Sequence, residues 1–172
     1  AQTDNDKEGW LTAEYSLLPG STSPRSNRDR MRISGRTSEI QRLIGRSLRA
    51  CIDLGNLGHR TITIDADVIQ ADAGTRVASI TGGFVAMMDA LYFLQSEGRL
   101  ETLPDIKPIA AVSVGIVEGT ALLDLNYEED FAADVDANVV MVEGGEFIEF
   151  QATCEGQPFN REQFDELADL AS

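Results

Sequence analysis

The stretch that decides the fold is TITIDADVIQADAGTRVASITGG, residues 61–83. It opens with alternating β-branched residues, which predict a strand within residues 59–70. A run of small residues follows, and apolar residues at helical spacing then predict a helix over about 79–96. A strand, a tight turn and a helix in this order are typical of a layered fold in which helices pack on a sheet.

Arg76 is the residue in this stretch that the fold does not explain. It lies close to the predicted helix start, where the aligned peptide dipoles already place partial positive charge. Gly74 and Thr75 precede it, and small residues allow an anion to approach the free N–H groups of a first helical turn. Sequence alone leaves two interpretations open: a phosphate pocket at Gly74, Thr75 and Arg76, or a plain turn with a solvent-facing arginine.

The flanking sequence predicts the rest of an α+β fold with helices packed on a largely antiparallel sheet. Helical spacing and N-cap residues predict a helix over 37–54, capped by Thr37 or Ser38, and a last helix from Asn160, whose Gln163 completes a capping box. Alternation and turn residues predict a strand over 10–18 and two hairpins, over 106–130 with its turn at Glu118–Gly119 and over 137–153 with its turn at residues 143–145.

Arg36 resembles Arg76 in its surroundings. It stands in SGRTSEI, residues 34–40, again beside a glycine and a threonine and just before a predicted helix. Two helix starts of this kind could converge on one phosphate, because each offers an arginine and unpaired N–H groups. The alternative is an arginine on the surface, and the sequence does not distinguish the two.

Clustered carboxylates mark NYEEDFAADVDANVV, residues 126–140, between the two predicted hairpins. Asp130 and Asp136 stand out, with Glu128 and Asp134 nearby. Carboxylates without histidine or cysteine suit a hard cation such as Mg²⁺, which one or two carboxylates can hold together with water and substrate phosphates. A solvated acidic connection is the alternative interpretation, and from the residues alone it is the one favoured.

Charge is unevenly distributed along the 172 residues, whose formal net charge is −15. Residues 1–60 hold ten Lys and Arg against seven Asp and Glu, a balance of +3, whereas residues 61–172 hold four against 22, a balance of −18. An acidic protein repels nucleic acid, so RNA binding requires a local basic patch. The first third supplies arginines for one: Arg25, Arg28, Arg30, Arg32, Arg36, Arg42, Arg46 and Arg49. The alternative role of such a charged segment is in subunit contacts or surface salt bridges.

Several classes of function are disfavoured. His59 is the single histidine, so a Ser-His-Asp or Cys-His mechanism is not expected. Cys51 and Cys154 are far apart and match no metal spacing, which indicates reduced thiols and a cytoplasmic protein. The sequence has no uninterrupted apolar run of about 18 residues, and a membrane partner is not expected.

Taken together, five segments resemble the bacterial ribonuclease PH family in order and spacing, over nearly the whole chain. These are residues 9–22, 35–54, 61–83, 110–141 and 145–159. The resemblance implies the ribonuclease PH fold, which is of the ribosomal protein S5 domain 2-like type, as one domain over 1–172. It also implies that the chain is truncated, without the first strands of the family and the end of its last helix.

The family is a phosphorolytic 3′-to-5′ exoribonuclease that trims tRNA precursors and releases nucleoside diphosphates. The resemblance therefore implies inorganic phosphate as co-substrate, bound by Arg36, Gly74, Thr75 and Arg76. It implies Mg²⁺ or Mn²⁺ at Asp130 and Asp136, which with Arg76 would be catalytic. It further implies RNA contacts at Arg25 and Arg28, and a homo-hexamer built as a trimer of dimers.

This chain departs from the family at two positions: Ala73 stands where a glycine is usual, and Gly20 where a basic residue is common. Two other functions compete with the enzyme. One is a non-catalytic ring subunit of exosome type, which binds RNA without turnover but typically loses the phosphate arginine or the metal aspartates. The other is an RNA-binding or assembly module, which the net charge of −15 disfavours.

Overall fold

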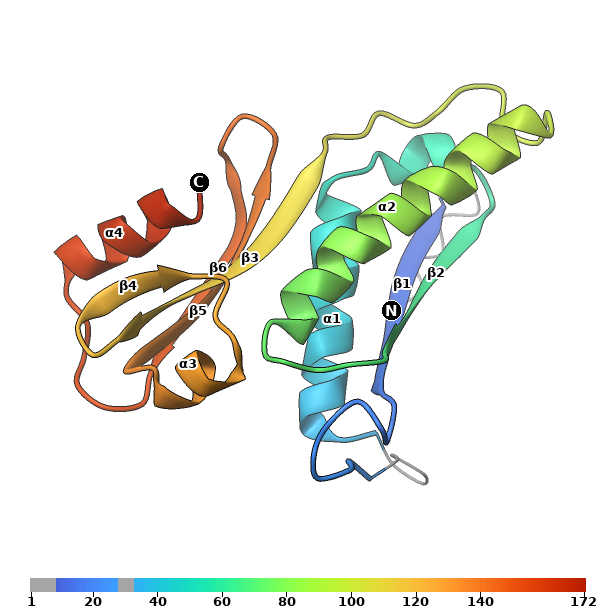
Figure 1. Ribbon diagram of the computed structural model, residues 1–172. Coiled ribbons are helices and arrows are strands. Elements are labelled where there is room, and N and C mark those ends of the chain that lie inside the picture. Colours follow the sequence, from blue (N-terminus) through green and yellow to red (C-terminus); the bar gives the residue numbers. More distant parts are fainter. Residues whose placement is uncertain (1–8, 28–32) are drawn as a thin grey trace.

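The protein, seen in a computed structural model that describes residues 9–27 and 33–172, consists of two sheets and the helices packed on them (Figure 1). The first part of the chain runs β1 (Trp10–Leu17), α1 (Gly35–Ala50), a 3₁₀ turn (Leu54–Leu57), β2 (Thr61–Val68) and α2 (Thr75–Ser96). The second part runs β3 (Ile109–Val117), β4 (Thr120–Leu123), α3 (Tyr127–Ala132), β5 (Val135–Val142), β6 (Phe147–Cys154) and α4 (Arg161–Leu170).

Strands β1 and β2 form a parallel pair, in register from Trp10 opposite Thr61 to Leu17 opposite Val68. Parallel neighbours need a crossover, and α1 provides it by packing across the pair. The alternating side chains of β1 send Leu11, Ala13 and Tyr15 into the core beneath the helices.

The other four strands form an antiparallel sheet in the order β4-β3-β5-β6. One face, with Ile109, Val140 and Val142, joins the core that contains α1 and α2. The opposite face, with Val114, Val139 and other apolar side chains, packs against Leu167 of α4. Helices α1 and α2 therefore lie between two sheets, and the expectation of an α+β fold with a largely antiparallel sheet is confirmed (Figure 1).

Both predicted hairpin turns are present. Glu118 and Gly119 take left-handed φ values of 49° and 77°, as a two-residue turn between β3 and β4 requires. Gly144 and Gly145, with φ of 98° and 89°, turn the chain between β5 and β6. The capping box of α4 also forms as predicted, because Asn160 accepts from the Gln163 N–H and Gln163 accepts from the Asn160 N–H.

Helix boundaries were predicted less well. Helix α1 begins at Gly35 with Ser34 as its N-cap, so the assignment of the cap to Thr37 or Ser38 is wrong. It ends at Ala50, and Asp53 then caps a separate 3₁₀ turn. Helix α3 was not predicted at all, although Asn126 and Glu129 form a capping box at its start. Its six residues are too few to show a helical period.

Helix α2 is apolar on more than its core face. Val77, Ile80, Met87 and Leu91 are buried in the protein, whereas Val85, Tyr92 and Phe93 are more than half exposed. By length and mean hydropathy α2 could cross a membrane, a test that the core helices of soluble proteins also pass. The core contacts of its buried face account for that hydropathy in part.

Gly115 illustrates how closely the second sheet is packed. A Cβ at this position of β3 would lie 2.6 Å from the Val135 carbonyl oxygen and 2.7 Å from Cδ1 of Leu125. We expect Gly115→Ala to lower the free energy of unfolding by about 1–3 kcal/mol, because the strand must shift to admit the methyl group. Urea denaturation measures this. Gly82→Ala on α2 is the control, since nothing lies within 4 Å of its added Cβ, and equal stability of the two variants would contradict the argument.

Candidate active site

The turn before α2 has the backbone geometry of an open helix start. Ala73 and Gly74 both take left-handed φ values, 58° and 56°, and the helix begins directly at Thr75. Gly74 is the N-cap residue of α2 and makes no side-chain cap hydrogen bond. The first N–H groups of α2 are therefore not satisfied by a capping oxygen. A left-handed conformation costs alanine about 1–2 kcal/mol, so Ala73 is a strained position in this turn.

Helix α2 thus begins four residues earlier than the predicted Ser79, and Arg76 lies within its first turn rather than before it. Arg36 likewise lies within the first turn of α1. The sequence analysis therefore placed both arginines before their helices, whereas each lies within the first helical turn. The first turn of α1 contains no buried apolar side chain to mark it, and in α2 the prediction overlooked the buried Val77.

Glu39 connects the two helix starts. Its carboxylate lies 3.2 Å from the Arg76 guanidinium, and the Arg76 side chain is 21% exposed. This ion pair joins the beginning of α1 to the beginning of α2 and holds Arg76 in one place. The sequence analysis did not assign Glu39 to the site, because its partner is 37 residues away.

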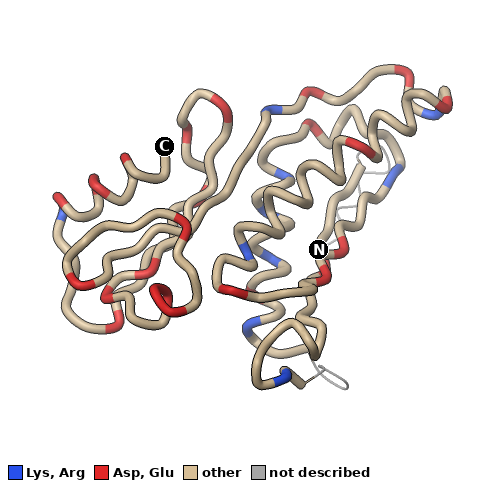
Figure 2. Tube along the Cα trace, in the orientation of Figure 1, with Lys and Arg blue, Asp and Glu red and all other residues tan. Residues whose placement is uncertain are grey.

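The acidic segment reaches the same region from the second sheet. Asp130 lies on α3 and Asp136 on β5, opposite Gly115 of β3. Asp72, just before the left-handed turn, accepts a hydrogen bond of 3.1 Å from the Tyr127 N–H at the start of α3. That bond holds α3, the helix that carries Asp130, against the turn that precedes Arg76. Figure 2 shows the acidic residues of α3 at the side of the sheet that faces the α1 and α2 layer.

The pKa of Asp136 shows which charged groups lie near its carboxylate. Burial raises its pKa, and the neighbouring carboxylate of Asp130 raises it further. The guanidinium of Arg76 lowers it, Glu155 raises it, and the guanidinium of Arg36 lowers it. Both predicted arginines and the other predicted aspartate, Asp130, therefore lie near enough to act on the half-buried carboxylate of Asp136. Glu155, at the end of β6, is a further acidic neighbour that the sequence analysis did not consider.

The described residues contain no cluster of three or more His, Cys, Asp or Glu side chains arranged to hold a metal ion. The chemistry of the two aspartates nevertheless fits a hard divalent cation. Asp130 and Asp136 repel one another across a partly desolvated space, and a cation between carboxylates would relieve that repulsion. Two carboxylates, water and substrate phosphate form an ordinary coordination set for Mg²⁺.

Some arginines of the predicted basic patch are engaged in contacts within the protein. Arg25 is exposed, and Arg28 lies outside the described residues. Arg46 is paired with Glu149 of β6 at 3.0 Å, and Arg49 donates to the Leu11 carbonyl and lies over the Trp10 ring. Arg46 and Arg49, two arginines of the predicted basic patch, therefore make contacts within the fold.

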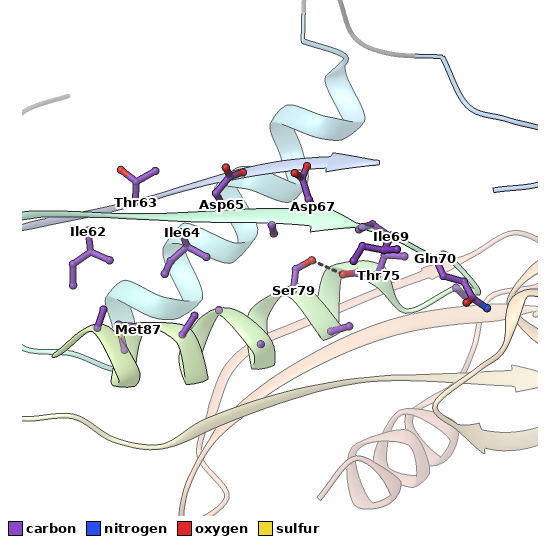
Figure 3. Close-up of a pocket in the computed structure, with 18 residues that line it drawn as sticks. Ile62, Thr63, Ile64, Asp65, Asp67, Ile69, Gln70, Thr75, Ser79 and Met87 are labelled. Atoms are coloured by element: carbon purple, nitrogen blue, oxygen red, sulfur yellow. Dashed lines mark hydrogen bonds between the residues drawn. The ribbon is translucent and has the colours of Figure 1, made fainter. Parts of the chain in front are cut away.

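A hollow among the described residues lies elsewhere, between β2 and α2 (Figure 3). Its volume is about 590 Å³, and its walls are mainly apolar, with Ile62, Ile64 and Ala86 among them. Of the predicted site residues it contains Thr75 alone. A mainly apolar groove does not suit an anion, so we do not assign the phosphate site to it.

Comparison with known proteins decides the family. A sequence profile described as the 3′ exoribonuclease family, domain 1, matches residues 1–92, and the profile for domain 2 of that family matches residues 107–172. The chain belongs to the 3′ exoribonuclease family. Within it, the chain is 60% identical over 163 residues to a curated protein named ribonuclease PH from Synechococcus sp. strain CC9605. It is 57% identical over 166 residues to a ribonuclease PH from Corynebacterium glutamicum strain R.

These matches confirm the resemblance to ribonuclease PH. They cover 95% of this chain, and 66% and 68% of the two relatives, so the chain spans about two thirds of the length of the curated relatives that it matches.

Among solved structures, one described as an Archaeoglobus fulgidus exosome with RNA bound to the active site aligns with a TM-score of 0.80 at 19% identity. That alignment covers 99% of this chain and 70% of the other. Rice Rrp46 aligns with a TM-score of 0.69 at 14% identity, over 98% and 68% of the two chains. At these identities the structures establish the exoribonuclease-family fold.

Proposed function

We propose that this chain carries the catalytic site of a ribonuclease PH, a 3′-to-5′ exoribonuclease that uses inorganic phosphate to shorten the 3′ ends of tRNA precursors. The observation that carries the proposal is that Arg36, Arg76 and Asp130 all act on the half-buried carboxylate of Asp136. Curated relatives named ribonuclease PH, at 55–60% identity, support it. RNA and phosphate are then the two substrates.

The arginines and the open start of α2 would hold the phosphate that attacks. A phosphate oxygen forms a bond to the phosphorus of the last phosphodiester, and the bond from that phosphorus to the preceding ribose oxygen breaks. The terminal nucleotide leaves as a nucleoside diphosphate, and the released ribose oxygen takes up a proton. The nucleophile is already an anion, so the protein supplies position and positive charge rather than a histidine base. This agrees with a site built from guanidinium and N–H groups.

Asp130 and Asp136 are the residues that would bind Mg²⁺ or Mn²⁺. When bound, the cation would neutralise charge on the scissile phosphate and on the departing ribose oxygen. Arg76 and Glu39 form a neutral pair, which limits how strongly the Arg76 charge attracts Asp136 before substrate binds.

The rival function is a non-catalytic ring subunit of exosome type. The structural neighbours include exosome proteins, and the shared fold does not separate the two functions. Arg36, Arg76, Asp130 and Asp136 are all present here, and the first three act on the Asp136 carboxylate, which favours the enzyme. We further propose a cytoplasmic homo-hexamer, a trimer of dimers, as the assembled form of the full-length protein.

The decisive experiment is incubation of the full-length protein with a short single-stranded RNA, with and without inorganic phosphate. The proposal predicts nucleoside diphosphates that appear only when phosphate is present. RNA that is bound but never shortened would support the ring subunit instead. Shortening that releases nucleoside monophosphates without phosphate would contradict phosphorolysis.

Arg25 offers a separate test of RNA binding. It is an exposed arginine after β1, and we propose that it contacts the RNA backbone together with Arg28. We expect Arg25→Ala to weaken RNA binding and to reduce the slope of log affinity against log salt by about 1, because one phosphate contact is lost. Filter binding over a salt series measures the slope. Arg161→Ala is the matched control, since this arginine is paired with Asp165 on α4. An unchanged slope for Arg25→Ala would contradict the contact.

A further inference from the structure

Tyr15 of β1 reaches the predicted phosphate turn from inside the core. The residue is 4% exposed, and its ring belongs to the apolar cluster beneath α1 and α2. Its hydroxyl lies 2.8 Å from Oγ1 of Thr75, the first residue of α2. This contact spans 60 residues, so β1 and the start of α2 are joined by one polar bond within an otherwise apolar layer.

The surroundings decide which hydroxyl donates. Within the described part of the chain, Thr75 Oγ1 is the one hydrogen-bond partner found for the Tyr15 hydroxyl. If Thr75 were the donor, the Tyr15 proton would remain buried without an acceptor, which is costly. The favourable arrangement therefore has Tyr15 donating to Thr75. The proton of the Thr75 hydroxyl is then free to point toward a ligand.

The backbone at Thr75 is fixed as well. Its carbonyl accepts a hydrogen bond of 2.7 Å from Ser79 Oγ, one turn along α2 (Figure 3). The helix start has no capping side chain of its own. The backbone position of Thr75 and the direction of its hydroxyl are therefore both fixed. Thr75 lies at the end of α2 where the uncapped N–H groups are.

We propose that Tyr15 is a positioning residue for inorganic phosphate. By donating to Thr75 Oγ1, it orients the Thr75 hydroxyl as a hydrogen-bond donor to a phosphate oxygen at the start of α2. This inference rests on the proposed function and deepens it. Tyr15 itself touches neither phosphate nor RNA, because it is buried behind Thr75.

The test is steady-state kinetics of the full-length protein and its Tyr15→Phe variant, with phosphate and RNA varied separately. We expect Tyr15→Phe to raise KM for phosphate about five- to tenfold, as expected for the loss of one oriented hydrogen bond. We expect KM for RNA, and kcat at saturating phosphate, to change less than about twofold. A purely structural role would not separate the two substrates in this way. Tyr92→Phe, at a half-exposed position of α2, is the matched control.

A double-mutant cycle supplies the second measurement. Thr75→Val removes the hydroxyl that Tyr15 orients, so adding Tyr15→Phe to it should raise KM for phosphate no further. Additive effects of the two changes would overturn the proposal, as would an equal rise in both KM values for Tyr15→Phe. Wild-type protein that shows no phosphate-dependent release would instead overturn the proposed function itself.

Discussion

Arg76→Ala removes phosphate-dependent shortening of RNA while RNA binding largely persists. This is the expected result because Arg76 lies in the first turn of the uncapped helix α2, held by Glu39 at 3.2 Å and close to Asp136. Loss of one positioned donor at a site of developing negative charge costs about 10²–10³-fold in rate. Release of nucleoside diphosphates measures the loss, and filter binding measures RNA affinity in the same preparation.

The control for Arg76 is Arg161→Ala, which also removes one arginine but from an exposed i,i+4 pair on α4. It should leave turnover unchanged. Glu39→Gln separates position from charge, because it leaves Arg76 in place and removes its anionic partner. We expect Glu39→Gln to be only partly active. If Arg76→Ala weakened RNA binding as much as turnover, Arg76 would be an RNA contact and not a phosphate ligand.

The strands, the hairpin turns and the last helix could be predicted because each depends on residues close together in the sequence. Alternation over residues 61–68, left-handed residues at Gly144 and Gly145, and the Asn160 cap are local signals, and the structure contains them all. The candidate residues of the site were local signals too. Arg76 after a glycine and a threonine, and two aspartates in a short acidic segment, could be identified without knowing what they face.

What could not be predicted was the set of contacts between distant segments. Glu39 meets Arg76 across 37 residues, Tyr15 meets Thr75 across 60, and Asp72 meets the Tyr127 N–H across 55. Sequence spacing carries no information about such pairs, since they exist only after the two sheets have packed on the helix layer. The same packing gives Arg46 and Arg49 partners within the fold, although the sequence analysis counted both in a basic patch for RNA.

Asp136→Asn should lower turnover and at the same time raise the stability of the folded protein. We expect turnover to fall to less than about 1% of wild type, because one of two carboxylates assigned to the divalent cation is lost. We also expect the variant to unfold at a higher temperature than wild type at pH 7. Burial and Asp130 raise the pKa of Asp136, so the ionised carboxylate lowers the stability of the folded state, and asparagine removes that charge.

The direction of the pKa shift at Asp136 determines how the stability gain depends on pH. A carboxyl whose pKa is raised by folding stabilises the protein fully below its unfolded pKa, and this contribution is lost as pH rises through the folded pKa. The stability gain from Asp136→Asn should therefore be largest at neutral pH and vanish in acid, where the wild-type carboxyl is also neutral. Thermal unfolding across a pH series measures it. Asp134→Asn, at an exposed position two residues earlier, is the control and should change neither turnover nor this pH profile.

Loss of turnover together with gain of stability would exclude misfolding as the cause of inactivity. It would identify Asp136 as a residue kept at a cost to the fold, which is common where function requires a buried charge. Chelation of divalent cations should abolish wild-type turnover as well. Activity of the Asp136→Asn variant, or wild-type activity in buffer free of divalent cations, would contradict the assignment of a metal site to this carboxylate.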